Sequence, residues 1–329
     1  MPARERRDVV EAIRNGEKFC LITHENPDGD ALGSLVGMHR ALLQLGKDSV
    51  MLAAPKEFPL APEYAFFERQ GIQTEKPADL AGRTIIFLDC GNIDRSPFAD
   101  VKDVAATVLN IDHHHDNTEF GTVNLVVGDA SCTGEIVWRL MKDLDVAMTR
   151  EIADALYVAL VTDTGKFMYE NTGVDAHTMA GELIAAGIDV QAIYRQLYEG
   201  LPYSKLRLLE RALHGVKRYD DGALTMASIS LKDFASAEAQ ESDSEGVVDH
   251  LRAVEGTKVA AMSRELRPSD NGGAPPKKVS LRSTDGTVDV SVIARGQGGG
   301  GHKAAAGFST ELSDDELVAF LRKQIAAQL

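Results

Sequence analysis

The chain has 329 residues and is acidic, because 35 Lys and Arg face 50 Asp and Glu for a formal net charge of −15. This length predicts about two domains, and the negative field opposes non-specific binding to long DNA or RNA. No window approaches 18 apolar residues, so we expect no membrane span, and the unpaired spacing of Cys20, Cys90 and Cys132 favours a reducing, cytoplasmic location.

The first half of the chain alternates between short apolar runs and helical patterns. Such alternation is typical of an α/β domain with a doubly wound, mostly parallel sheet. The apolar runs predict strands, and the longer amphipathic stretches predict helices. We expect strands at 18–23, 49–53, 84–88 and 105–109, and helices at 6–15, 31–45, 133–144 and 149–160.

The second half changes character after a long helical stretch. Residues 175–216 have a helical pattern with a break near Gly200-Leu201-Pro202, which is typical of a connector. Strands are then expected at 223–230, 257–264 and 277–283, a surface loop at 268–276 and a last helix at 314–327. We therefore predict a first domain at 1–195, a helical linker at 196–220, and a smaller α/β domain with a mixed sheet at 221–329.

The densest polar cluster is Asp112-His113-His114-His115-Asp116, which follows the apolar run predicted as a buried strand. Ligands of open α/β sheets bind at the carboxyl ends of the strands. Carboxylates and imidazoles packed this closely cost stability unless another group satisfies them. A bound metal ion is the simplest explanation.

Three further polar sites follow predicted elements in the same way: His24, Asp28 and Asp30 after one strand, Asp89 after another, and Asp163 at the end of a helix. Each alone has an ordinary explanation, since Asn-Pro-Asp-Gly-Asp is also a common turn. Together they form an oxygen-rich set with few imidazoles, which suits Mn²⁺ or Mg²⁺ better than structural zinc. The set exceeds the needs of one ion, so we expect two divalent cations about 4 Å apart that share a water directed at phosphorus.

The second domain contains a glycine run, Gly298 to Gly301, followed by His302. Glycine lets backbone N–H groups approach an anion closely, and we expect His302 to begin a short helix whose N-terminus favours negative charge. A flexible linker is the alternative. Arg264 and Arg282 lie on predicted strands, where a guanidinium suits phosphate or base recognition or is simply exposed.

In this order, His24-x-x-x-Asp28-x-Asp30, Asp89, Asp112-His113-His114 and Asp163 resemble the motifs of the DHH phosphoesterase superfamily, and the glycine run with His302 resembles its associated C-terminal domain. Within the superfamily the chain looks most like the nanoRNase and pAp-phosphatase group. One departure is Gln297, where family members often carry an aromatic residue.

The resemblance implies two cations, with Mn²⁺ preferred and Mg²⁺ or Co²⁺ as alternatives, and a homodimer. Asp89 would bridge the cations, Asp112 would orient an imidazole, and His114 would face the scissile phosphate. His115 receives no role. The implied sets are His24, Asp28 and Asp89 for one cation, Asp30, Asp89, His113 and Asp163 for the other, and Arg264, Arg282, Ser283, Gly300, Gly301 and His302 for substrate.

We therefore expect an enzyme that hydrolyses short oligoribonucleotides to mononucleotides or removes the 3′-phosphate of adenosine 3′,5′-bisphosphate. Linear and cyclic dinucleotides are further candidate substrates. A manganese pyrophosphatase would carry a basic Ser-Arg-Lys-Lys stretch, of which Ser263-Arg264 is only a faint echo. A RecJ-like single-strand exonuclease would be longer, and a non-catalytic nucleotide or metal sensor would be expected to lack a ligand.

Overall fold

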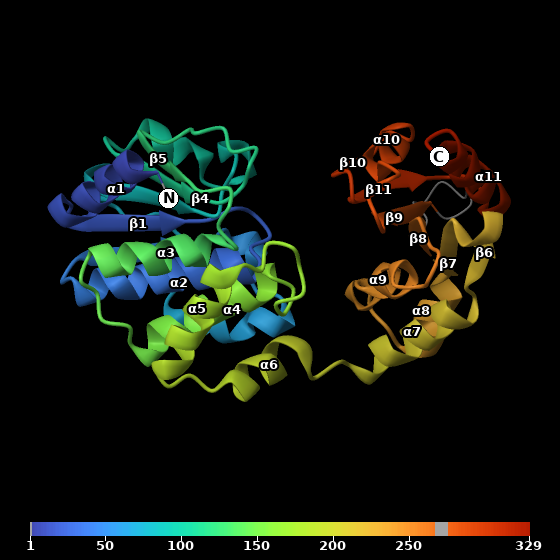
Figure 1. Ribbon diagram of the computed structural model, residues 1–329, viewed down its shortest axis with the longest axis horizontal. Helices are drawn as coiled ribbons and strands as arrows, with labels where there is room; N and C mark the ends of the chain where they lie inside the picture. The colour runs from blue at the N-terminus through green and yellow to red at the C-terminus, as the bar shows by residue number, and fades with distance from the viewer. Residues whose placement is uncertain (1, 267–275) are drawn as a thin grey trace. The chain divides into compact units, whose positions relative to one another are not determined.

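Two sheets, one in each half of the chain, organise the computed structural model (Figure 1). The structure describes residues 2–266 and 276–329, and the chain divides into two units, Met1–Gly200 and Leu201–Leu329. Most of the predicted loop at 268–276 lies outside the described residues. No helix within the described ranges is long and apolar enough to cross a membrane.

The first sheet has five parallel strands in the order β2-β1-β3-β4-β5, which confirms the α/β class. The strand predicted at 105–109 begins later, because the register pairs Ile85 with Val108. The polar residues Asn110 and Asp112 hid its true extent, and β5 was not predicted. The strands are β1 Lys18–Ile22, β2 Asp48–Leu52, β3 Thr84–Leu88, β4 Val108–Asp112 and β5 Val123–Val126.

Alternating side chains of this sheet fill two cores. Phe19 and Leu21 of β1 enter a core shared with the α-helices, whereas Cys20 and Ile22 enter a second core that includes residues of short 3₁₀ helices, as the period of two in a strand requires. The α-helices are α1 Ala3–Asn15, α2 Gly29–Gln44, α3 Thr133–Asp143, α4 Arg150–Asp163, α5 Val174–Ala185 and α6 Val190–Tyr198, and the 3₁₀ helices are η1 Pro55–Glu57, η2 Pro62–Gln70, η3 Leu80–Gly82, η4 Ile93–Arg95 and η5 Ala99–Asp103.

Helices α2 and α4 pack antiparallel through glycines spaced four residues apart on α2. A Cβ atom on Gly33 would lie 2.4 Å from the backbone oxygen of Ala155, and one on Gly29 would lie 2.4 Å from Thr162 Oγ1. Residues four apart lie on one helix face, so the two backbones approach closely along that face. The N-terminus of α2 therefore lies beside the C-terminus of α4.

The second sheet has six strands in the order β10-β11-β9-β8-β7-β6. Among its described residues, only β7 and β8 pair in parallel, so the predicted mixed sheet is confirmed. Helices α10 and α11 share one core with it, and α7, α8 and α9 share another. The elements are α7 Tyr203–His214, β6 Lys217–Tyr219, η6 Asp220–Gly222, β7 Leu224–Ile229, α8 Leu231–Ala237, η7 Glu241–Ser244, α9 Val247–Arg252, β8 Val259–Glu265, β9 Lys277–Ser283, α10 Val290–Arg295, β10 Gly300–Gly301, β11 Ala305–Thr310 and α11 Asp314–Ala326.

The short helix predicted to begin at His302 is wrong. His302 and Ala305 instead close a turn between β10 and β11, since the His302 N–H donates to the Ala305 oxygen at 2.7 Å and the Ala305 N–H donates back at 3.2 Å. Pairing of β11 with β9 buries Ala306 and Phe308. That tertiary packing outweighs the helix propensity of the alanine run.

Candidate metal centre

The predicted acidic and histidine residues converge at one edge of the first sheet. Strands β1, β3 and β4 are neighbours, so the residues that follow them, His24, Asp89 and His113, meet at their carboxyl ends. The antiparallel packing of α2 and α4 adds Asp30 from the start of one helix and Asp163 from the end of the other. The structure therefore brings four separate chain segments to a single site.

Distances within the site suit ligands of shared cations. Asp89 Oδ2 lies 3.5 Å from His24 Nε2, and Asp89 Oδ1 lies 3.7 Å from His113 Nε2. His113 Nε2 also lies 3.8 Å from Asp30 Oδ2 and 3.7 Å from Asp163 Oδ2. These separations are long for hydrogen bonds, but two donors about 2.1 Å from one ion stand roughly 3–4 Å apart.

Within the part of the chain that the structure describes, three groups of residues could each hold an ion, since the donor atoms of each group lie within 4.8 Å of one another. Asp89 and His113 each belong to two of them, as residues between two ions would. One group is identical to the ligand set predicted for the first cation. The residues predicted for the second cation are divided between the other two groups. The groups are His24, Asp28 and Asp89; Asp30, His113 and Asp163; and Asp89, His113 and His114.

The backbone around the carboxylates fixes their directions. Asp89 has φ +56°, a left-handed conformation that Asp tolerates better than most residues, and its Oδ1 accepts a hydrogen bond from Thr133 Oγ1 at 3.1 Å. Asp30 accepts from the Thr133 and Gly134 N–H groups at 2.7 and 2.9 Å. These donors begin α3, whose positive end stabilises a carboxylate. Thr133 was not predicted, although the expected helix start there was a signal.

The charges at the site are unbalanced without a cation. Burial raises the pKa of Asp30 well above its usual value, with Asp89 and Asp163 adding to the effect. Burial also raises the pKa of Asp163 to about 6. Burial opposes ionisation of Asp89 too, but three imidazoles led by that of His24 outweigh it and lower the pKa of Asp89. A divalent cation would neutralise this concentration of negative charge, so the residues fit such an ion.

The histidines present their nitrogens as ligands do. His24 Nδ1 lies 2.8 Å from the Glu25 oxygen and His113 Nδ1 lies 3.4 Å from the Ala130 oxygen. In both rings this leaves Nε2 for the carboxylate cluster, and an imidazole that binds metal commonly donates its other N–H in this way.

His114 differs, because Asp112 controls its ring. His114 Nδ1 donates to Asp112 Oδ1 at 2.8 Å, and Asn117 Nδ2, which was not predicted, donates to Asp112 Oδ2 at 2.6 Å. The hydrogen bond to this buried carboxylate raises the pKa of His114 to about 9. His115 is exposed and lies against Gly128.

The predicted substrate residues of the second unit are not gathered in the same way. Arg264 is 9% exposed and pairs with Glu241 at 2.5 Å, whereas Arg282 lies 3.5 Å from Asp249. Arg264 of β8 stands opposite Lys278 of β9. Arg282 lies four positions farther along β9, or about 13 Å along that strand. The two guanidinium groups instead lie beside different carboxylates, those of Glu241 and Asp249.

The glycine run has a packing role of its own. A Cβ atom on Gly301 would lie 2.6 Å from Ala306 Cα, so β10 can approach β11 only without side chains. Gly300, Gly301 and His302 are exposed, while Ser283 is buried and its Oγ has no hydrogen-bond partner among the described residues. Gln297 accepts a hydrogen bond from Thr310.

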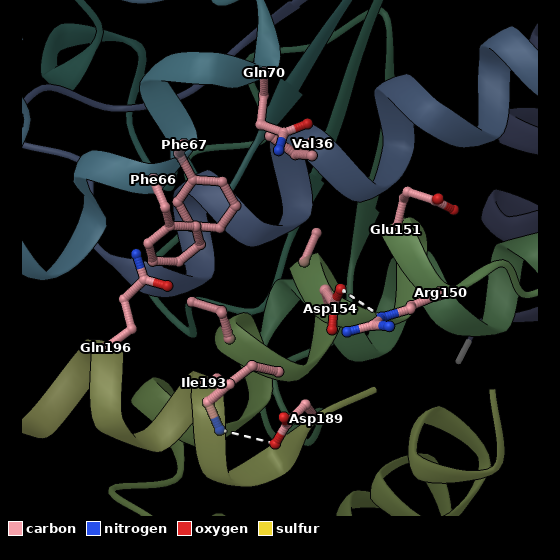
Figure 2. A pocket seen from close by; sticks show the side chains of 13 residues that line it. Val36, Phe66, Phe67, Gln70, Arg150, Glu151, Asp154, Asp189, Ile193 and Gln196 are labelled. Carbon is pink, nitrogen blue, oxygen red and sulfur yellow. Dashed lines mark hydrogen bonds and ion pairs between the residues drawn. The ribbon is translucent and has the colours of Figure 1, made fainter. Parts of the chain in front are cut away.

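A cavity of about 240 Å³ lies elsewhere in the first unit, between α2, η2, α4 and α6 (Figure 2). Phe66 and Phe67 form its aromatic wall, and Arg150 pairs with Asp154 at its margin at 3.6 Å. None of its lining residues belongs to the metal cluster. The cavity is therefore separate from the candidate metal centre.

Both halves of the chain match known protein domains. Residues 18–160 match the DHH family N-terminal domain, and residues 225–328 match the DHHA1 domain. The chain is 35% identical over 304 residues to the bifunctional oligoribonuclease and PAP phosphatase NrnA of Thermus thermophilus, covering 91% of this chain and 86% of that protein. A probable manganese-dependent inorganic pyrophosphatase of Streptococcus mutans is 32% identical over 183 residues, covering 53% of this chain and 57% of that one.

A solved structure shows the same fold. The exopolyphosphatase-related protein of Bacteroides fragilis superposes with a TM-score of 0.83 at 24% identity, covering 98% of this chain and 96% of that one. The chain therefore belongs to the DHH phosphoesterase family and is a hydrolase in which a DHH domain is followed by a DHHA1 domain.

Proposed function

We propose that this hydrolase cleaves short oligoribonucleotides to mononucleotides and removes the 3′-phosphate of adenosine 3′,5′-bisphosphate, with linear and cyclic dinucleotides as further substrates. The observation that carries the proposal is the position of Asp89, whose two oxygens face His24 and His113. One carboxylate between two imidazoles is the arrangement expected of a ligand shared by two cations. The relative from Thermus thermophilus is named for both activities and aligns along both domains.

In this proposal two Mn²⁺ ions are held at the site, with Mg²⁺ or Co²⁺ as substitutes. When bound, such ions activate water and offset the negative charge that develops on phosphorus. The chain's own residues set their places. One ion would be held by His24, Asp28 and Asp89, and the other by Asp30, Asp89, His113 and Asp163.

His114 is proposed as the proton donor. Its Nδ1 is held by Asp112, which leaves Nε2 for a phosphate oxygen or the leaving alkoxide. The hydrogen bond to Asp112 raises the pKa of His114 to about 9 in the metal-free structure, which favours a doubly protonated ring at neutral pH. A proton held there is available as the ester bond breaks.

The second domain is proposed to bind the part of the substrate that does not react. Arg282 and His302 are the proposed side-chain contacts, and the backbone of Gly300 and Gly301 is accessible beside them. Arg264 already pairs with Glu241 and Ser283 is buried. We therefore assign these last two to support of their strands and not to direct contact.

A substrate panel with Mn²⁺ tests the proposal. The panel comprises a ribodinucleotide, adenosine 3′,5′-bisphosphate, a cyclic dinucleotide, pyrophosphate and a long single strand, with Asp89→Ala as the inactive control. We expect turnover of the ribodinucleotide and of the bisphosphate. Turnover of pyrophosphate or of the long strand alone would contradict the proposal. The pyrophosphatase alternative is disfavoured because that relative's match covers 53% of this chain, while residues 225–328 match DHHA1.

We also propose a cytoplasmic homodimer. Cys20, Cys90 and Cys132 are free and buried, which supports a reducing location. Light scattering coupled to gel filtration should give twice the chain mass of 35.5 kDa, and a mass equal to one chain would contradict the dimer.

A further inference from the structure

The chain turns in an unusual way directly after Asp163. Gly165, Lys166 and Phe167 have φ values of +54°, +64° and +65°, and this left-handed region is costly for residues other than glycine. Such conformations persist where the surroundings fix them, often at functional sites. Here the Lys166 N–H donates to the Val161 oxygen at 2.8 Å, and the Phe167 ring stacks on His177 with 5.3 Å between centroids.

The turn is also tied to the metal cluster at its far end. Asn171 Nδ2 donates to the backbone oxygen of Asp163 at 3.1 Å, to its Oδ2 at 3.3 Å and to the Ser131 oxygen at 2.9 Å. The segment 165–171 therefore starts and ends at a carboxylate of the site. Hydrogen bonds from Asn171 therefore tie the far end of this segment back to Asp163.

This turn presents Tyr169 with its ring lying on the backbone of Gly165. A Cβ atom on Gly165 would lie 2.4–2.5 Å from three carbons of that ring, so only glycine permits the contact. Tyr169 nevertheless remains 54% exposed, and its N–H donates to the Thr164 oxygen at 3.0 Å. The result is a positioned aromatic ring with an open surface.

Position and chemistry together indicate what this ring contacts. Gly165 follows Asp163 by two residues, so their Cα atoms are at most about 7.6 Å apart, comparable with the span of one nucleotide. Aromatic side chains bind single-stranded bases by stacking. Stacking does not require a positively charged surface, which an acidic chain such as this one lacks. Lys166, whose Nζ lies 4.0 Å above the Tyr198 ring, places one cation on the same turn.

We propose that Tyr169 is the platform on which a nucleobase of the substrate stacks, next to the phosphate held at the metal centre. This inference rests on the proposed function and deepens it. It assigns the site a preference for esters that carry a base over phosphates that carry none.

The test compares Tyr169→Ala and Tyr169→Phe with the wild-type protein in Mn²⁺. The substrates are a ribodinucleotide and the same molecule with hydrogen in place of both bases. Tyr169→Ala should lower kcat/KM for the ribodinucleotide about tenfold, mainly through KM, as expected for the loss of one stacked base. Tyr169→Phe should stay within about twofold, since it keeps the ring. Both variants should hydrolyse the base-free molecule at the wild-type rate.

Val174→Ala is the matched control, because it truncates an apolar side chain that is 82% exposed five residues along the chain. Calorimetric titration with Mn²⁺ supplies a second readout and should give the same affinity for every variant. Equal losses on both substrates would overturn the inference, since Tyr169 would then only support Asp163. A Tyr169→Ala protein with unchanged kcat/KM would overturn it too. A wild-type protein that hydrolyses pyrophosphate alone would overturn the proposed function first.

Discussion

Asp163 is expected to destabilise the protein without metal and to stabilise it with metal. Burial raises the pKa of its carboxyl to about 6 in the metal-free structure, and Asp89 and Asp28 reinforce the shift while His113 opposes it. A carboxyl whose folded pKa is raised contributes its full stability below its unfolded pKa near 3.8. That contribution is lost as the pH rises through 6.

The magnitude follows from the shift. From about 3.8 to about 6 is roughly two pKa units, and each unit corresponds to about 1.4 kcal/mol. The Asp163 side chain is 28% exposed, so we expect about 2–3 kcal/mol. Asp163→Asn removes the charge and keeps the shape, and its amide oxygen can still accept the hydrogen bond from Asn171. At pH 7.5 in a chelator the variant should be more stable by that amount, or by roughly 5–10 °C in Tm for a unit of this size.

Manganese should reverse the order. At a thousandfold excess over its Kd a bound ion stabilises a protein by about 4.1 kcal/mol, which exceeds the deficit of about 2–3 kcal/mol, and the variant lacks one proposed ligand. The assay is denaturant unfolding of both proteins in chelator and in Mn²⁺, with Asp145→Asn as control because that side chain is 92% exposed. Equal stabilities in chelator, or equal gains from Mn²⁺, would refute the reasoning.

Three further changes test other parts of the structure. Asp89→Ala should lower kcat/KM by more than the 10- to 100-fold typical of replacing a residue that hydrogen-bonds to a metal ligand. It should also reduce the number of Mn²⁺ ions bound in a calorimetric titration, and full stoichiometry would contradict its bridging position. Asp112→Asn removes the negative charge of the carboxylate that raises the pKa of His114, so activity should fall at a lower alkaline pH than in the wild type. Superimposable pH profiles would count against the proton-donor role. Burial lowers the pKa of His39 to about 4, so stability should decline as the pH falls from 6.5 towards 4, and His39→Gln should flatten that decline in unfolding experiments; an unchanged slope would rule out His39 as its source.

Much of the site was predictable because its geometry is local. His24 and Asp89 follow apolar runs that end in polar residues, and neighbouring parallel strands place such residues together whatever the details of packing. The same rule located His113, although the preceding strand was placed three residues too early. Residues at strand ends are therefore predictable even when the strand limits are not.

Features that depend on contacts distant in sequence were not predictable. The ion pair of Arg264 with Glu241 joins residues in different elements, so the strand pattern could not reveal that this guanidinium is already paired. Thr133 reaches Asp89 and Asp30 only after the helix that it begins has packed against α2. The turn at His302 was mistaken for a helix because the alanine run has a local preference that the pairing with β9 overrides.

The glycines on α2 determine how closely α2 and α4 pack, and therefore the distance between the carboxylates of Asp30 and Asp163. Gly29, Gly33 and Gly37 each meet atoms of α4 within 2.7 Å of where a Cβ would stand, so any side chain there acts as a wedge between Asp30 and Asp163. None of these glycines contributes a side chain to the chemistry, and Gly33 and Gly37 lie about one and two turns farther along α2 than Gly29. A genetic screen for inactive variants should nevertheless recover substitutions of these glycines as well as of the metal ligands. Few residue types other than glycine are therefore tolerated on this face of α2.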